Sequence, residues 1–219
     1  RPCMTHAQVA ASYSKLDILE TSDASRFFGT IWRGLAIFPA TLLQKKWTEE
    51  IRLTSASSNR FEWMIGFFYT DEDNRHDQIV HAFDNDGEIL DFFDPFAIVA
   101  LPNKYKEYAM FGNATYKFTE RFHLTGGMRW ARNEQTFNEV TQIPLIGLDI
   151  GGPGESEENV FTFSISPQFN INRDAMVYAR VASGYRPGGP NVALPGFPAT
   201  VDSETVTSYE AGVKARFLD

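Results

Sequence analysis

The chain has 219 residues, a formal net charge of −8 at pH 7, and an aromatic content of 14% that includes 19 Phe and 8 Tyr. This acidic balance argues against nucleic acid as the main partner, because phosphate backbones are bound by clustered Lys and Arg. Its single cysteine, Cys3, excludes an intrachain disulfide framework and a cysteine-based zinc site, and no run of about 18 apolar residues predicts a transmembrane helix.

Strands with alternating side chains are predicted along most of the chain, since successive side chains on a strand point to opposite faces. The segment THAQVAASYSKLD predicts the first strand, whereas residues 21–46 lack a clear pattern and are expected to form a loop. The runs WTEEIRLTS and RFEWMIGFFYT predict a hairpin, because only a short polar link at residues 57–59 joins them.

The clearest pattern is a second hairpin, formed by residues 105–118 and 121–137. In its first strand Met110 and Tyr116 share one face, opposite Glu107, and the second strand repeats this alternation. Strands of soluble domains are usually about five or six residues long, whereas crossing a bilayer takes roughly 9 to 11. These runs therefore favour transmembrane strands with one face toward lipid and the other toward water.

Further strands follow toward the C-terminus. A third hairpin is predicted from NVFTFSISPQFNI and AMVYARV, which meet at a tight turn around residues 172–174, and a final strand from ETVTSYEAGVKARF, whose hairpin partner is missing. Residues 73–104, 138–157 and 186–203 are expected to be long loops, the first carrying a small hairpin of QIVHAF and EILDFF around an Asn-Asp-Gly turn. Short turns on one rim and long loops on the other are typical of outer-membrane barrels.

Four phrases resemble the barrel region of TonB-dependent outer-membrane receptors: EEIRLTS followed by RFEWMIGFFYTDED, YAMFGNATYKFTERFHLTGGMRWARNE, NVFTFSISPQFNINRDAMVYARVASGYRPGGPN, and ETVTSYEAGVKARFLD. The resemblance implies uptake of a scarce solute, such as a ferric siderophore or cobalamin, through a plugged barrel of about 22 strands. It implies outer-membrane lipid, the energy-coupling protein TonB and a small-molecule ligand as partners, and neither enzyme activity nor a cofactor.

No plug domain and no N-terminal segment for TonB is recognised. The expected fold is therefore all-β: a partial antiparallel transmembrane β-barrel, in which residues 1–219 supply about eight long strands of the larger barrel domain. Two alternatives remain open, a soluble β-sandwich for binding or adhesion and a small passive outer-membrane pore. The first would pack its aromatic residues inside a closed core, and the second would pair its first and last strands.

The candidate ligand pathway lies on the predicted water-facing side of the strands and in the last long loop. Inward polar residues tune what a barrel admits, so cations and aromatic hydroxyls there could guide an anionic ligand. The candidates are Arg52, Arg129, Tyr178, Arg180, Arg186 and Asn191, and Lys214 and Arg216 lie on the same predicted face. Alternatively, Glu side chains on the same face, including Glu50, Glu107 and Glu210, pair with the cations and stabilise the wall. His76 and His81 are expected to be solvated loop residues, and no metal-binding or nucleophile motif is found.

Overall fold

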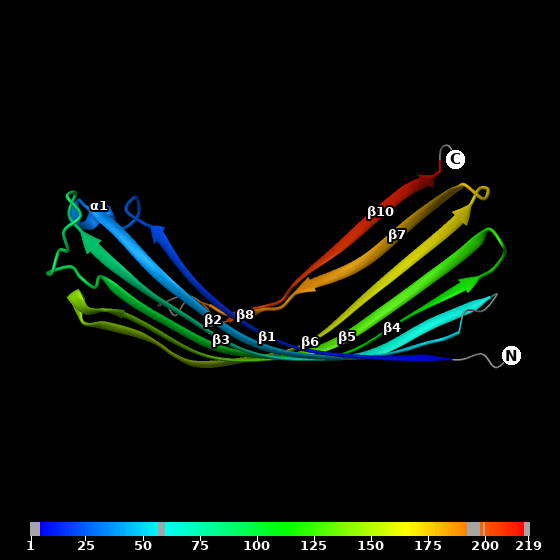
Figure 1. The fold of residues 1–219 in the computed structure, drawn as a ribbon, viewed down its shortest axis with the longest axis horizontal. Helices are drawn as coiled ribbons and strands as arrows, with labels where there is room; N and C mark the ends of the chain where they lie inside the picture. Colours follow the sequence, from blue (N-terminus) through cyan, green and yellow to red (C-terminus); the bar gives the residue numbers. More distant parts are fainter. Residues whose placement is uncertain (1–4, 57–59, 192–197, 199, 217–219) are drawn as a thin grey trace.

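The computed structural model of the chain describes residues 5–56, 60–191, 198 and 200–216 (Figure 1). Eight long antiparallel strands form one sheet in the order β1-β2-β3-β4-β5-β6-β7-β10. Their bounds are β1 (His6–Asp23), β2 (Leu35–Thr54), β3 (Phe61–Phe83), β4 (Ala97–Lys117), β5 (Phe122–Ile143), β6 (Leu148–Asn170), β7 (Ala175–Arg186) and β10 (Glu204–Ala215). The remaining elements are the helix α1 (Gly29–Trp32), the 3-10 turn η1 (Pro144–Ile146) and a small ribbon of β8 (Gly189–Pro190) and β9 (Thr200–Val201).

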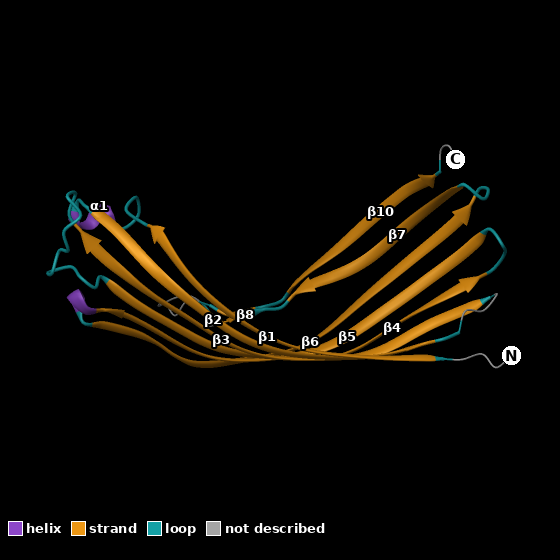
Figure 2. Cartoon of the chain, in the orientation of Figure 1, coloured by secondary structure: helices purple, strands orange, loops and turns teal. Residues whose placement is uncertain are grey.

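The sheet curves into an open trough, with the short turns at one end of the strands and the longer connections at the other (Figures 1 and 2). β1 and β10 lie at opposite edges and do not pair with each other within the described residues. The structure therefore confirms the predicted class, an all-β antiparallel sheet of eight long strands in a partial barrel. In the part of the chain that is described, no helix has the length and hydropathy to cross a membrane.

The outer face of the sheet carries a continuous apolar band. One row across four strands places Phe67 opposite Met110, Met110 opposite Trp130, and Trp130 opposite Phe161. These side chains are exposed, with Met110 at 63% and Trp130 at 42% of their full accessible surface. Exposed apolar side chains in one contiguous band suit a hydrocarbon environment, as the alternation predicts.

Toward the long-loop end, the same face becomes charged. The row that contains Trp47 continues through Asp71, Lys106 and Glu134, and Lys106 Nζ lies 3.6 Å from Asp71 Oδ2. Because β2 to β6 are 20 to 23 residues long, they extend well beyond the roughly 9 to 11 residues that cross a bilayer. Each of these strands thus combines an apolar half and a water-exposed half.

The expected loop at residues 21–46 is wrong, because it contains the end of β1, the helix α1 and the first half of β2. The β2 part lies in the charged half of the sheet, where Leu42 pairs with His76 and Lys45 with Asp73. Residues 35–43 of β2 are apolar at almost every position, and Ala36 is fully buried, so no alternation marks the strand although the backbone ladder continues.

The loops expected at residues 73–104 and 138–157 are also much shorter than predicted. β3 continues to Phe83 and β4 begins at Ala97, while β5 and β6 are linked only by η1 and its flanking residues. The expected small hairpin is reduced to a turn with one isolated bridge between Phe83 and Ile89. The third expected loop lies partly outside the described residues, and the link at 57–59 lies wholly outside them. The strands on either side of that link pair as expected.

A compact apolar cluster joins the two loops at the long-loop end of β1 to β4. Trp32 packs with the fully buried Ala36 and Ala82, against rings that include Phe93 and Phe96. The Trp32 ring centroid lies 5.2 Å from that of Phe96 and 5.8 Å from that of Phe93. This cluster holds residues 24–34 against residues 84–96 and so gives both loops a defined shape.

Trp32→Ala should therefore release these two loops while leaving the apolar half of the sheet intact. Truncating a buried Trp to Ala typically costs about 3–5 kcal/mol, which exceeds the stability expected of a small loop cluster. Limited proteolysis in detergent should show new cleavage within residues 24–34 and 84–96. The matched control is Phe27→Ala, because Phe27 is 83% exposed and its loss should leave the cleavage pattern unchanged.

Gly151 provides a test of the long β5–β6 hairpin. Its φ of 126° is rarely adopted by L residues, and a Cβ there would lie 2.1 Å from the carbonyl oxygen of Glu139. Gly151→Ala should cost about 1–3 kcal/mol through backbone strain and open the outer part of this hairpin to amide hydrogen exchange. Gly126→Ala is the control, since a Cβ at Gly126 meets no atom within 4 Å. Equal exchange in the two variants would contradict the strand assignment.

Candidate functional site on the concave face

A polar network lies on the concave face of the sheet, where β4 and β5 enter its charged half. The Arg129 guanidinium forms an ion pair with the carboxylate of Glu107, although Arg129 lies four residues along β5 from Asn133, the residue opposite Glu107 in the ladder. The Tyr105 hydroxyl lies 2.6 Å from Glu107 Oε2 and 2.9 Å from Asn133 Oδ1. The Tyr185 hydroxyl lies 3.1 Å from the same Glu107 oxygen, so two phenols and a guanidinium surround one carboxylate.

This network is packed rather than solvated. Asn133 retains 2% and Glu107 8% of their full accessible surface. The Arg129 guanidinium lies 5.2 Å from the ring centroid of Phe68 and 5.8 Å from that of Phe111, within the range of cation–π attraction. A buried carboxylate is stable when it is paired and hydrogen-bonded, and Glu107 meets both conditions.

The end of β7 crosses over this face. Ladder pairing between β6 and β7 extends from Ser164, opposite Ala182, to Asn170, opposite Met176. Beyond Ala182 the described part of β7 pairs with β10 alone, and this release from β6 carries Tyr185 over the sheet to Glu107.

The β8–β9 ribbon is fastened to the same face at its base. Gln135 Nε2 donates a hydrogen bond to the carbonyl oxygen of Gly188 at 2.6 Å. The carboxylate of Glu158 accepts from the backbone N–H groups of Gly188 at 3.3 Å and Ser203 at 2.9 Å. Figure 1 shows the ribbon on the concave side of the sheet. The ribbon thus narrows the space above β5 and β6.

The structure brings three of the predicted pathway residues to this region. Arg52 pairs with Glu50 and lies 6.0 Å from the ring centroid of Phe111, which it shares with Arg129. Arg129 and Arg180 line one depression of about 250 Å³. The alternative interpretation, in which Glu side chains pair with the cations, holds for Arg52, which pairs with Glu50, and for Arg129, which pairs with Glu107. None of the ion pairs within the described residues involves Arg180.

The other predicted residues lie apart from the network. The Tyr178 hydroxyl donates to Glu210 Oε1 at 2.6 Å, on the shorter strands β7 and β10. Arg186 ends β7, and Asn191 Nδ2 donates to the carbonyl oxygen of Pro198 at 3.0 Å in the long-loop region. Their roles in ligand binding stay predictions.

Several network residues were not among the sequence-based candidates: Tyr105, Glu107, Asn133, Gln135, Glu158 and Tyr185. Glu107 was nevertheless expected on the polar face as a partner for the cations, and its ion pair with Arg129 agrees with that alternative. The alternation indicated no role for Asn133. Tyr185 carried no usable signal, because its position depends on β7 leaving β6. The two loop histidines, His76 and His81, lie on β3 instead, and no group of three potential metal ligands occurs within the described residues.

Comparison with known proteins identifies related barrels. Residues 5–219 match the family model described as TonB dependent receptor-like, beta-barrel. The pesticin receptor of Yersinia pestis is 28% identical over 117 residues, and that of Yersinia enterocolitica 27%. Each alignment covers 51% of this chain and 16% of the relative, so the chain spans only a fraction of these proteins' length.

Two solved structures share the fold. The ferric yersiniabactin uptake receptor FyuA from Yersinia pestis superposes with a TM-score of 0.78 at 17% identity, covering 98% of this chain and 31% of that one. The ferric-catecholate import receptor Fiu from K12 E. coli gives a TM-score of 0.65 at 14% identity, covering 98% of this chain and 36% of that one. At these identities the likeness is one of architecture.

Glu107→Gln tests whether the concave network stabilises the wall. The substitution leaves the Arg129 charge without its partner and should lower the free energy of unfolding by about 1–3 kcal/mol, measured by urea titration of the protein purified in detergent. The control is Glu134→Gln on the outer face, where Glu134 pairs with Arg132 at 3.0 Å in an exposed position. That exposed pair should contribute less than about 1 kcal/mol. Equal losses in the two variants would contradict a special role for the network.

Proposed function

The chain belongs to the TonB-dependent receptor family, and on this premise we propose that its sheet is one sector of the wall of an outer-membrane transporter for a ferric siderophore. Members of this family are transporters rather than enzymes. The proposal is supported by the two architectural neighbours, whose names specify ferric yersiniabactin uptake and ferric-catecholate import. In this proposal, TonB supplies the energy through a region outside the chain.

The edges of the sheet support the sector assignment. Along β1 and β10 one side of the backbone has no ladder partner within the described residues. An unsatisfied backbone group in hydrocarbon costs several kcal/mol, so such edges in a membrane require neighbouring strands. The share of FyuA that the chain covers, 31%, leaves room for them. A plug domain from outside this chain would then occupy the trough.

The observation that carries the proposal is the separation of the two faces over the membrane-crossing half of the sheet. An apolar band lies on the outside, while charged and aromatic side chains such as Arg129, Phe111 and Arg180 share the concave side. Ferric chelates often carry negative charge and aromatic rings, and guanidinium groups beside rings can bind both. The concave wall therefore suits an anionic chelate in transit.

The two alternative functions fit the structure less well. A soluble sandwich requires a second sheet over the apolar face, and β8 and β9 form the only other sheet in the described residues, on the concave side. A small passive pore requires β1 to pair with β10, whereas these strands lie at opposite edges. The soluble sandwich would also leave the exposed band that contains Met110 and Trp130 without an explanation.

Iron uptake tests the proposed function directly. Disrupting the gene should abolish growth on at least one ferric siderophore as the sole iron source, with ferric yersiniabactin and a ferric catecholate as the first compounds to try. Restoring the gene should restore growth only in cells that also contain TonB. Uptake of cobalamin serves as the comparison for a different solute class. Growth on every tested iron source without the gene, combined with lost cobalamin uptake, would overturn the ferric assignment.

Arg180→Gln separates a pathway role from a structural one. Because an exposed cation contributes about 0.2–1 kcal/mol to attraction of an anion, its loss should slow initial uptake of radioactive iron roughly two- to five-fold. Stability in urea should not change, since Arg180 has no ion pair within the described residues. Lys15→Gln removes one charge from the outer side of β1 and is the matched control. Equal uptake by both variants would argue against Arg180 as a guide.

A further inference from the structure

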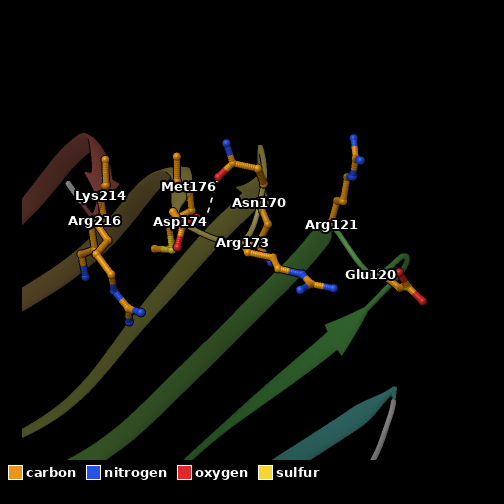
Figure 3. A pocket seen from close by; sticks show the side chains of 11 residues that line it. Glu120, Arg121, Asn170, Arg173, Asp174, Met176, Lys214 and Arg216 are labelled. Carbon is orange, nitrogen blue, oxygen red and sulfur yellow. Dashed lines mark hydrogen bonds between the residues drawn. The ribbon is translucent and has the colours of Figure 1, made fainter. Parts of the chain in front are cut away.

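A basic pocket lies at the short-turn end of β5, β6, β7 and β10, far from the network around Glu107. It has a volume of about 640 Å³ and is lined by four cations, Arg121, Arg173, Lys214 and Arg216, together with two carboxylates, Glu120 and Asp174. Figure 3 shows Arg173 and Asp174 on the turn that joins β6 to β7, Glu120 and Arg121 on the turn before β5, and Lys214 and Arg216 at the end of β10. The pocket carries excess positive charge in a chain whose net charge is −8.

The pocket belongs to the concave side of the sheet. Met176, which lines it, lies opposite Asn170 on β6 and Lys214 on β10 in the ladder. The neighbouring positions Val177 and Val213 also lie opposite each other and carry the apolar outer face. Since neighbours on a strand point to opposite sides, Lys214 and Met176 face the trough and not the lipid.

The cations of this pocket are poorly neutralised. None of the ion pairs within the described residues includes Arg121, Arg173, Lys214 or Arg216. Lys214 lies 5.3 Å from the ring centroid of Tyr178, and the backbone N–H of Arg216 donates to the carbonyl oxygen of Asp174, but neither contact offsets a charge. Elsewhere on the concave face, by contrast, Arg52 and Arg129 each have a Glu partner.

We propose that this basic pocket binds an acidic polypeptide segment that enters the trough from the short-turn side. Carboxylates of such a segment would accept paired hydrogen bonds that the guanidinium groups donate in bidentate geometry. The volume accommodates several side chains, which exceeds what one phosphate ion needs. A lipid headgroup is the weaker candidate because the concave face does not meet the bilayer. The inference rests on the proposed function in one respect, namely that the trough is the inside of a bore.

Photo-crosslinking in the native membrane tests the proposal. A photoreactive amino acid replaces Met176, which lines the pocket and whose side chain contributes no charge, and mass spectrometry identifies what it captures. The expected adduct is a peptide rich in Asp and Glu, and the position of that peptide shows whether it belongs to the same polypeptide or to another. Capture of a lipid, capture of a peptide without excess acidic residues, or no adduct at all would overturn the proposal.

Charge variants make the same experiment quantitative. Combining Arg121→Gln with Arg173→Gln should lower the adduct yield about five-fold, because two of the four cations that would pair with the carboxylates are removed. Glu120→Gln should raise the yield by removing a repulsive charge, an effect that misfolding cannot produce. Moderate salt should lower the yield in every variant. Lys15→Gln combined with Arg26→Gln removes two charges elsewhere and should leave the yield unchanged.

The inference would be overturned if the adduct yield changed in the same way whether a positive or a negative charge was removed. The iron-uptake result would not be affected by that outcome. A lipid adduct would have a different meaning, because it would place the concave rim against the bilayer and contradict the bore itself. The two failures are therefore distinguishable.

Discussion

The whole structure depends on one constraint, that the backbone ladder holds adjacent strands in a register that keeps every apolar row on the same side. Side chains alternate with a period of two, so a slip of one residue in any strand would transfer its apolar set to the concave face. The row from Phe67 through Met110 and Trp130 to Phe161 shows that no such slip occurs across β3 to β6. One face can therefore meet hydrocarbon while the other retains charged groups.

This constraint explains which parts of the fold were predictable from sequence. In the apolar half of the sheet, lipid demands an apolar residue at every second position, so the hairpin of β4 and β5 is legible in the residues themselves. In the long-loop half of the sheet neither face has to meet lipid. The ladder that pairs Leu42 with His76 therefore leaves no alternating pattern in the sequence. The strands there were consequently predicted as loops, and Gly151 on β6 pairs with Val140 although its φ of 126° departs from ordinary strand geometry.

The concave network illustrates a different limit of sequence analysis. Alternation placed Glu107 and Arg129 on the correct face, but their ion pair spans 22 residues of sequence and needs the exact register of β4 against β5. Tyr185 lies further beyond reach, since it joins Glu107 only because β7 separates from β6 and crosses the trough. The contact of Tyr185 with Glu107 depends on where β7 separates from β6, and no local sequence pattern indicates that position.

The centre and the short-turn end of the concave face differ in how many of their cations form ion pairs, and this difference bears on how the trough is filled. Near the middle, Arg52 and Arg129 are neutralised within the sheet itself, whereas Arg180 beside them has no ion pair among the described residues. At the short-turn end the exposed cations of the basic pocket lack such partners among the described residues, and clustered charge of one sign attracts an anionic neighbour. A wall that neutralises itself in one region and remains cationic in another has surfaces for two kinds of contact. The central region stabilises the sheet and adjoins the ligand path, and the rim remains open to a second molecule or segment.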